Sequence, residues 1–261
     1  MEEQENKNIV KVDSIFLTTT IVKFLRNNQY YSATGFFFSD KENNVYLVTN
    51  KHVIYGKDYS HNDSKPKIDE LRLILHSDQN NLSKNEEVSV NLYKEGEQIW
   101  KEHNNKEIDV ICIPINLDRH KFIFVTIGND LLDFSNLKIG FEKIFVMGYP
   151  YGWYDILNNL PITRVGHLSS PFGVAFQGKP FMLGDVETHK GMSGSPVFMY
   201  LKDYITEGAD GRNSIHVGTL KMLLVGVFSG QPIWRTKENK EIPHSLSIIW
   251  FSEIIKEIVN C

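Results

Sequence analysis

Cysteine is scarce in this sequence of 261 residues, which contains only Cys112 and Cys261. Secreted proteins of this general kind commonly carry several disulfides, whereas proteins of a reducing compartment do not. The scarcity of cysteine therefore predicts a cytoplasmic protein. We interpret Cys112 as a small buried apolar residue and Cys261 as an inert terminal thiol.

Long apolar runs are also missing, and none approaches the roughly 20 residues that a helix needs to cross a bilayer. The first six residues are acidic and polar. A secretory signal begins instead with lysine or arginine and continues into an unbroken apolar segment. We therefore expect no signal peptide and no membrane partner.

Dense runs of positive charge are a third absence. The chain has 28 lysine and arginine residues against 32 aspartate and glutamate residues, a net charge of -4. Phosphate binding needs clustered positive charge, so this balance argues against nucleic acid as the main partner, although a local basic groove would not be visible in it. The hydrophobic share of 41% is ordinary for a soluble globular protein.

What the chain does contain is a long series of short apolar and β-branched segments separated by polar turns, which is typical of an all-β protein. Helical character is confined to residues 252–259, with Ser252 placed as the N-cap. The expected strands cover residues 10–25, 33–39, 45–49, 71–75, 88–93, 107–114, 122–127, 143–148, 162–168, 174–176, 181–183, 196–200, 220–228 and 246–250.

A linker near residues 116–136 divides these strands into two comparable groups. We expect residues 1–8 to form a disordered tail, residues 9–120 an N-terminal β-barrel, and residues 121–261 a C-terminal β-barrel with the terminal helix. A cleft between two barrels would explain a long β protein that is divided in this way.

The stretch 191–197, Gly-Met-Ser-Gly-Ser-Pro-Val, carries the strongest local signal. Its glycines allow a tight turn that exposes the hydroxyl of Ser193, and the N–H groups of Gly191 and Ser193 can aim at one point, as an oxyanion hole requires. An α/β-hydrolase elbow needs glycine two positions after the serine, where this chain has Ser195, so that fold is excluded. An ordinary Gly/Ser turn remains the alternative.

A serine nucleophile needs a base and a carboxylate, and both occur upstream. His52 follows an expected strand and precedes a loop, where functional groups are often presented. Asp109 opens the most apolar strand of the first half, which we expect to be covered on both faces. A carboxylate there must be paired, and a histidine N–H is a suitable partner. Glu107 is the rival acid, and a solvated strand end is the plain alternative for Asp109.

The chain order His52, Asp109, Ser193 resembles that of the chymotrypsin-like serine peptidases, and most closely their disulfide-free bacterial branch, the trypsin-like peptidase domain of HtrA-like proteins. The resemblance spans roughly residues 33–230. It rests on six blocks in order: Ala33-Thr34-Gly35-Phe36, residues 47–53 around His52, Ile108-Asp109-Val110, Gly148-Tyr149-Pro150, residues 191–196 around Ser193, and Val225-Gly226-Val227.

The resemblance implies two six-stranded antiparallel β-barrels with the active site between them, and peptide-bond hydrolysis without cofactor or metal. Ser193 would be the nucleophile, His52 the general base, and Asp109 the residue that orients it. The amides of Gly191 and Ser193 would form the oxyanion hole. Phe228-Ser229-Gly230 would pair with the substrate backbone, and Glu187, six residues before Ser193, would occupy the floor of the specificity pocket.

Three departures from the family qualify this picture. Met192 stands where secreted members have an aspartate, Ser195 replaces a second glycine, and we expect no peptide-binding domain after the helix. Two other functions remain as alternatives: a protease-fold binding or regulatory module that is latent until a partner binds, and an esterase that uses the same residues. We expect a protein or peptide substrate. A regulatory protein partner and the oligomeric state are left open by the sequence.

Overall fold

The computed structural model describes residues 12–57, 59–61, 65–140, 142–208, 210–232, 234–235, 241–242 and 245–260. The expected disordered tail at residues 1–8 and the terminal Cys261 lie outside these ranges. Cys112 is fully buried and unpaired, and burial raises the pKa of its thiol, as expected for an inert core residue. No helix in the described ranges has the length and hydrophobicity needed to span a membrane.

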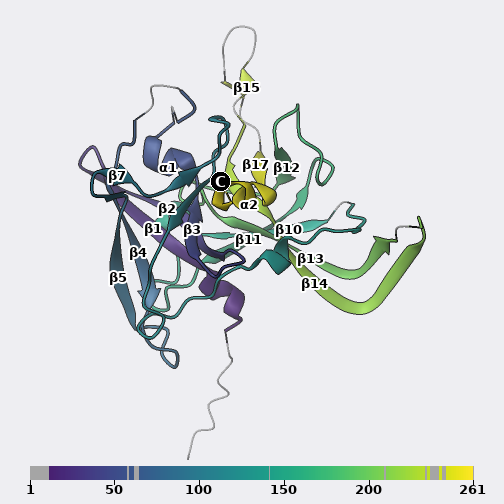
Figure 1. Ribbon diagram of the computed structural model, residues 1–261, viewed down its shortest axis with the longest axis horizontal. Helices are drawn as coiled ribbons and strands as arrows, with labels where there is room; N and C mark the ends of the chain where they lie inside the picture. The colour runs from purple at the N-terminus through teal and green to yellow at the C-terminus, as the bar shows by residue number, and fades with distance from the viewer. Residues whose placement is uncertain are drawn as a thin grey trace, which may run out of the picture.

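The first half of the chain is built on one antiparallel sheet, seen on the left of Figure 1. Seven strands form it in the order β5-β4-β1-β2-β3-β9-β8. Their bounds are Thr19–Arg26 (β1), Gln29–Ser39 (β2), Val45–Thr49 (β3), Glu70–His76 (β4), Asn85–Asn91 (β5), Lys101–Glu102 (β8) and Ile111–Pro114 (β9). Two short strands, Tyr93–Lys94 (β6) and Glu97–Gln98 (β7), pair separately. The sheet thus has one strand more than the six expected.

The second half is a closed six-stranded barrel with the order β10-β11-β12-β17-β14-β13. Its strands are Lys143–Gly148 (β10), Ile162–Leu168 (β11), Phe181–Asp185 (β12), Pro196–Glu207 (β13), Asn213–Gly230 (β14) and Leu246–Phe251 (β17). A short pair, Trp234–Arg235 (β15) and Glu241–Ile242 (β16), lies before β17, and the single-turn helices η2 (Asn129–Leu132) and η3 (Pro150–Gly152) lie in loops. The predicted fold class, an all-β double barrel with a terminal helix, is confirmed.

Several elements differ from the sequence-based prediction at their ends. Residues Ser14–Thr18 form a 3-10 helix (η1) rather than strand, because the Asp13 carboxylate accepts the N–H of Ile15 and starts a turn. Residues 174–176 form no strand, and only Phe176 makes an isolated bridge, to Lys179. The second half also has a longer hairpin than expected, since β13 and β14 continue outward past the barrel, as Figure 1 shows on the right.

A helix closes the chain and joins the two halves. Helix α2, Glu253–Val259, has Ser252 at its N-cap position, although the Ser252 side chain makes no capping hydrogen bond. Four of its residues are buried: Ile254, Ile255, Ile258 and Val259. Each contributes about 1.5–3 kcal/mol from apolar burial. They belong to one core cluster that also contains Phe36 and Val48 of the first sheet and Phe198 and Leu224 of the barrel.

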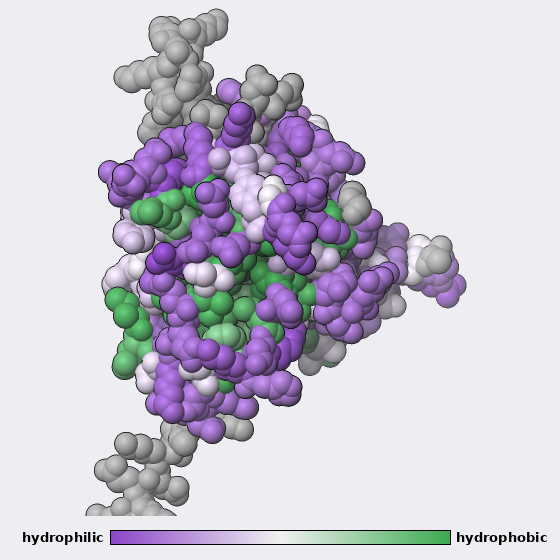
Figure 2. Space-filling model, turned by 60° about the vertical axis from the view of Figure 1, so that its left-hand side comes forward, coloured by the Kyte–Doolittle hydropathy of each residue, from purple (hydrophilic) through white to green (hydrophobic). Residues whose placement is uncertain are grey.

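The two halves therefore share a core, so their relative position is set by packing as well as by the connecting chain. Most apolar side chains of the described residues are buried in the core. Figure 2, which turns the first sheet toward the viewer, shows hydrophilic side chains over most of this face and apolar ones at its centre and left edge.

Candidate active site

Strand pairing in the first sheet brings His52 and Asp109 together. Strand β3 pairs antiparallel with β9, and Thr49 lies opposite Ile111. The residues that follow β3 and those that precede β9 therefore meet at one end of the sheet. His52 lies in α1, Lys51–Tyr55, a single helical turn directly after β3 that the sequence analysis did not predict. Asp109 lies two residues before β9, which begins later than expected and is buried on both faces, as predicted.

The carboxylate of Asp109 is almost completely buried, with 1% of the residue exposed, and it accepts three hydrogen bonds. Its Oδ1 accepts the backbone N–H of His52 at 2.8 Å. Its Oδ2 lies 2.6 Å from Nδ1 of His52 and accepts the hydroxyl of Ser229 at 2.5 Å. Because an ionised carboxylate only accepts, Nδ1 of His52 carries the proton in this pair, which leaves Nε2 free to act as a base.

Helix α1, which carries His52, is anchored to strand β8 by a buried ion pair. Nζ of Lys51 lies 2.8 Å from Oε2 of Glu102, and the two side chains are 3% and 10% exposed. Oε1 of Glu102 accepts the hydroxyl of Tyr55 at 2.5 Å and the indole N–H of Trp100 at 2.8 Å. Burial alone would raise the pKa of Glu102, but the hydrogen bonds from Lys51, Tyr55 and Trp100 outweigh burial and lower it. These contacts fix the orientation of α1.

The loop that carries Ser193 needs glycine at two positions. Gly191 has φ +94 and Gly194 has φ +87, in the left-handed region that favours glycine. A Cβ on Gly191 would lie 2.4 Å from the carbonyl oxygen of Tyr149, and one on Gly194 would lie 2.2 Å from that of Thr34. The glycines therefore allow the loop both its turn and its close approach to neighbouring backbone.

Two residues outside the loop hold its peptide groups. The hydroxyl of Thr34 donates to the carbonyl of Gly191 at 2.8 Å, and the N–H of Thr34 donates to the carbonyl of Ser193 at 2.9 Å. The N–H of Tyr151 donates to the carbonyl of Lys190 at 2.5 Å. Because this carbonyl belongs to the peptide bond that ends at the N–H of Gly191, the contact also sets the direction of that N–H.

Among the described residues, the N–H groups of Gly191 and Ser193 have no hydrogen-bond partner. The N–H groups around them do: Met192 donates to the carbonyl of His189 at 3.2 Å, and Gly194 to that of Phe228 at 2.9 Å. Two open N–H donors, one on the serine itself and one two residues before it, are the kind of arrangement that stabilises a negatively charged oxygen.

The hydroxyl of Ser193 donates to the carbonyl of Ser229 at 3.2 Å, and in the described part of the chain it makes no hydrogen bond to His52. Ser229 therefore contacts both parts of the site, since its own hydroxyl binds Asp109. A transfer of the Ser193 proton to His52 requires the hydroxyl to leave the Ser229 carbonyl and turn about its Cα–Cβ bond.

The residues expected to bind substrate fall in different surroundings. Phe228 is 2% exposed, and its backbone N–H and carbonyl are bonded to Ser195 and Gly194, so it supports the loop that carries Ser193 and does not face a substrate. Ser229 and Gly230 are half-buried and lie where β14 has lost its neighbour β13, which begins at Pro196 opposite Val227. These two residues keep the expected position at an open strand edge.

Glu187 does not form the floor of a pocket. Its side chain is 74% exposed and forms an ion pair with the guanidinium of Arg164, which also donates to the Glu187 carbonyl at 3.0 Å. Nε2 of His189 lies 3.7 Å from Oε1 of Glu187. The rival acid Glu107 makes an ion pair with Lys179 at 3.0 Å and makes no contact with His52. Its neighbour Asp109 is the acid that meets the imidazole.

The supporting contacts of Thr34, Tyr151 and the Ser229 hydroxyl were not predicted from the sequence. Thr34 lies in one of the six family blocks, but nothing in the pattern indicates that its hydroxyl reaches Gly191, more than 150 residues later. No cluster of three or more histidine, cysteine, aspartate or glutamate residues that could hold a metal ion occurs within the described ranges.

Comparisons with known proteins agree with this architecture. Residues 33–202, more than half of the chain, match the family described as trypsin-like peptidase domain. No curated protein matches the chain. Among solved structures, the HtrA-type protease AlgW with tripeptide has a TM-score of 0.51 and 14% identity, covering 94% of this chain and 60% of its own.

The thermostable serine protease AL20 from an extremophilic microorganism has a TM-score of 0.50 and 8% identity, covering 94% of this chain and 97% of its own. At these identities the two structures show a shared fold alone, and this chain spans about three fifths of the length of the HtrA-type protease. The fold and the match over residues 33–202 show that this chain belongs to the trypsin-like peptidase domain family.

Proposed function

We propose that this chain is a serine endopeptidase in which Ser193 is the nucleophile, His52 the general base and Asp109 the residue that orients it. One observation carries the proposal. Nδ1 of His52 is bound to the buried carboxylate of Asp109, and Ser229 bonds both to that carboxylate and to the hydroxyl of Ser193, whose own N–H and that of Gly191 are open among the described residues. A turn without catalytic function has no need for this combination.

The reaction follows from these positions. Oγ of Ser193 attacks the carbonyl carbon of the peptide bond while its proton moves to Nε2 of His52. The carbonyl oxygen becomes an oxyanion and is held by the N–H groups of Gly191 and Ser193. The imidazolium, stabilised by Asp109, gives its proton to the leaving amine nitrogen, and the acyl group stays on Ser193.

Water completes the cycle. It loses a proton to Nε2 of His52 as its oxygen attacks the acyl carbon, and the same proton returns to Oγ of Ser193 as the ester bond breaks. All steps use side chains and backbone of this chain, with peptides or proteins as the proposed substrates. We further propose a cytoplasmic setting from the scarcity of cysteine, and no nucleic acid or membrane partner from the charge balance.

The test is covalent labelling of folded protein with a fluorophosphonate, followed by mass spectrometry of the modified peptide. We expect labelling at Ser193 that is absent in Ser193→Ala and strongly slowed in Asp109→Asn, because asparagine cannot hold the imidazole in the required tautomer. Folded wild-type protein that takes up no label would overturn the proposal.

The second candidate, a protease-fold module that is latent until it binds a partner, is favoured by one specific contact. The Ser193 hydroxyl is bonded to the Ser229 carbonyl rather than to His52. The candidates differ in their kinetics: a latent module is labelled slowly alone and faster once its partner is bound, whereas a constitutive enzyme is labelled at the same rate with and without that partner. Comparing peptide and ester hydrolysis tests the esterase alternative in the same preparation.

A further inference from the structure

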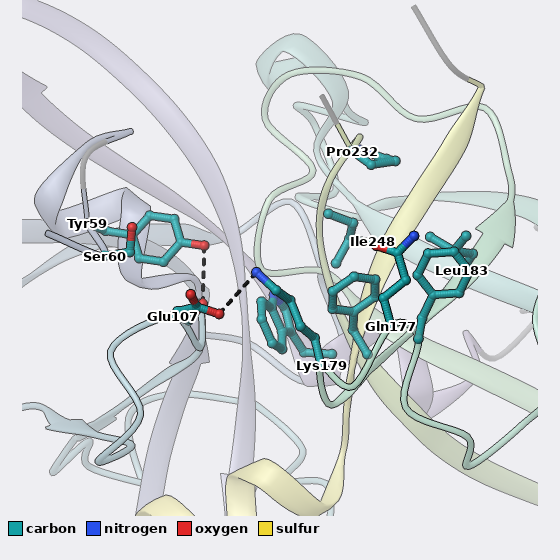
Figure 3. Close-up of a pocket in the computed structure, with 11 residues that line it drawn as sticks. Tyr59, Ser60, Glu107, Gln177, Lys179, Leu183, Pro232 and Ile248 are labelled. Carbon is teal, nitrogen blue, oxygen red and sulfur yellow. Dashed lines mark hydrogen bonds and ion pairs between the residues drawn. The ribbon is translucent and has the colours of Figure 1, made fainter. Parts of the chain in front are cut away.

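A large pocket lies between the two halves, beside the triad. Its volume is about 530 Å³, within the range of sites that bind small ligands or single side chains. Figure 3 shows Tyr59 and Glu107 of the first half on one side, with Lys179, Leu183, Ile248 and Pro232 of the second half on the other.

The pocket adjoins the catalytic residues. The ring of Tyr59 lies 6.4 Å from that of His52, and its hydroxyl donates to the backbone carbonyl of Glu107 at 3.4 Å. Glu107 is two residues from Asp109. Burial raises the pKa of the Tyr59 hydroxyl, and the charges of Asp109 and Glu107 raise it further, so the phenol facing the pocket stays neutral.

The inner wall of the pocket is apolar. It is formed by three aromatic residues, Phe176, Phe181 and Trp250, and by the aliphatic residues Leu183 and Ile248. Phe181 packs edge to face on Trp250 with ring centroids 5.4 Å apart, and Phe176 lies 5.9 Å from Phe181. Strand pairing of Phe181 with Trp250 and of Leu183 with Ile248 fixes four of these side chains on rigid elements.

The mouth of the pocket carries both charges of a weak ion pair. Nζ of Lys179 lies 3.0 Å from Oε2 of Glu107, and the two side chains are 52% and 58% exposed. Exposed pairs of this kind contribute at most about 1 kcal/mol. A ligand can therefore separate Lys179 from Glu107 at little cost in free energy, because both side chains remain solvated.

The open edge of β14 determines which part of a bound peptide reaches this pocket. Strand β14 runs toward Pro232, and every strand pair of the barrel is antiparallel. A peptide that pairs antiparallel with β14 at Ser229 and Gly230 runs in the direction opposite to that strand. The part of the peptide near Pro232 therefore comes earlier in its sequence than the part at Ser193. Pro232 lies two residues past the end of β14 and three past Ser229, a span of at most about 10 Å of extended chain.

We propose that this pocket binds a large apolar or aromatic side chain within the four residues that precede the cleaved bond, and that it gives the protein its main substrate preference. The inference rests on the proposed peptidase function. The apolar wall attracts such a side chain by burial, whereas a small side chain buries less area there and a charged one finds no hydrogen-bond partner on that wall.

The test varies each of the four residues before the cleaved bond in a fluorogenic peptide library. At one of these positions, we expect phenylalanine, tyrosine or leucine to give kcat/KM values about 10- to 100-fold above those of glycine or aspartate. In Phe176→Ala, which removes one wall, this ratio should fall to a few-fold. Val174→Ala is the matched control, since Val174 is 56% exposed on the same loop and does not line the pocket.

A binding measurement covers the case of slow turnover. Dissociation constants of labelled peptides for Ser193→Ala, measured by fluorescence anisotropy, should show the same preference and the same loss when Phe176→Ala is added. Wild-type protein whose Ser193 takes up fluorophosphonate, but whose four positions all show ratios below about 3, would overturn the inference and leave the peptidase function intact. A ratio unchanged by Phe176→Ala would overturn it as well.

Discussion

Replacing Thr34 with valine tests whether a residue of the first half positions the oxyanion donors. The hydroxyl of Thr34 is fully buried, donates to the carbonyl of Gly191 at 2.8 Å and accepts the N–H of Tyr149 at 3.1 Å. Valine has nearly the same shape but neither donates nor accepts. The variant therefore leaves the partly buried carbonyl of Gly191 and the buried N–H of Tyr149 without their partner.

The magnitude follows from these two groups. A buried polar group left unsatisfied costs about 1–3 kcal/mol, so we expect a loss of about 2–5 kcal/mol in the free energy of unfolding. Complete removal of one oxyanion donor costs about 100- to 1,000-fold in kcat. Because Gly191 is shifted rather than removed, we expect a decrease in kcat of about 10- to 100-fold with KM little changed.

The assay is steady-state hydrolysis of a peptide substrate, with active sites titrated by fluorophosphonate and stability measured by urea unfolding. Thr34→Ser, which keeps the hydroxyl, should restore most of the kcat. Thr20→Val is the matched control, because the buried Thr20 hydroxyl donates to the carbonyl of Ile74 at 3.0 Å, away from the loop. If Thr34→Val and Thr20→Val lose stability alike and both keep the wild-type kcat within twofold, Thr34 has no positioning role.

Three further predictions concern other parts of the structure. Ser229→Ala removes the hydroxyl that donates to Asp109 at 2.5 Å and should lower kcat about tenfold while Ser193 remains labelled by fluorophosphonate; an unchanged kcat would contradict the role of that contact. Glu102→Gln leaves the buried Lys51 unpaired and should cost about 3 kcal/mol in urea unfolding at neutral pH. Since the folded-state pKa of Glu102 lies below its ordinary 4.5, this difference is full above that pH and shrinks as pH falls through the lowered value; a difference independent of pH would refute it. Gly194→Ala brings a Cβ within 2.2 Å of backbone and should abolish activity, whereas Gly218→Ala, with φ +72 but open space, should cost about 1–3 kcal/mol in stability without loss of activity; equal effects would show that φ alone matters.

The sequence predicted most strands of the barrels because apolar and β-branched runs report local structure directly. The prediction of strands failed where strand pairing or turn residues determine the local structure. Residues 174–176 are mostly apolar, yet they lie between Gly173 and Gly178, which have positive φ and turn the chain back on itself. The outer part of the β13–β14 hairpin has only isolated apolar residues between polar ones, such as Ile205, Ile215 and Val217, so its strands are defined by pairing with each other more than by an apolar run.

The candidate site likewise has residues that local sequence patterns predicted and residues that they did not. His52, Asp109 and Ser193 were predicted because each stands in a short local pattern and the three occur in a known order. The exposure of Glu187 was not predicted, because a spacing of six residues does not report where a loop turns or that Arg164 from β11 meets the carboxylate. Thr34 and Tyr151 were missed since their function lies in hydrogen bonds across the fold, which leave no periodic signal.

The geometry of the groove depends on contacts between the halves more than on either half alone. His52 and Asp109 are fixed to each other within the first sheet, but the Ser193 loop is held partly by the second barrel, through Phe228, and partly by the first sheet, through Thr34. The closing helix α2 packs on the first sheet and continues the chain from β17 of the barrel. A change that loosens this shared interface therefore moves Ser193 relative to His52 before either half unfolds, so activity should be lost at a lower denaturant concentration than the secondary structure.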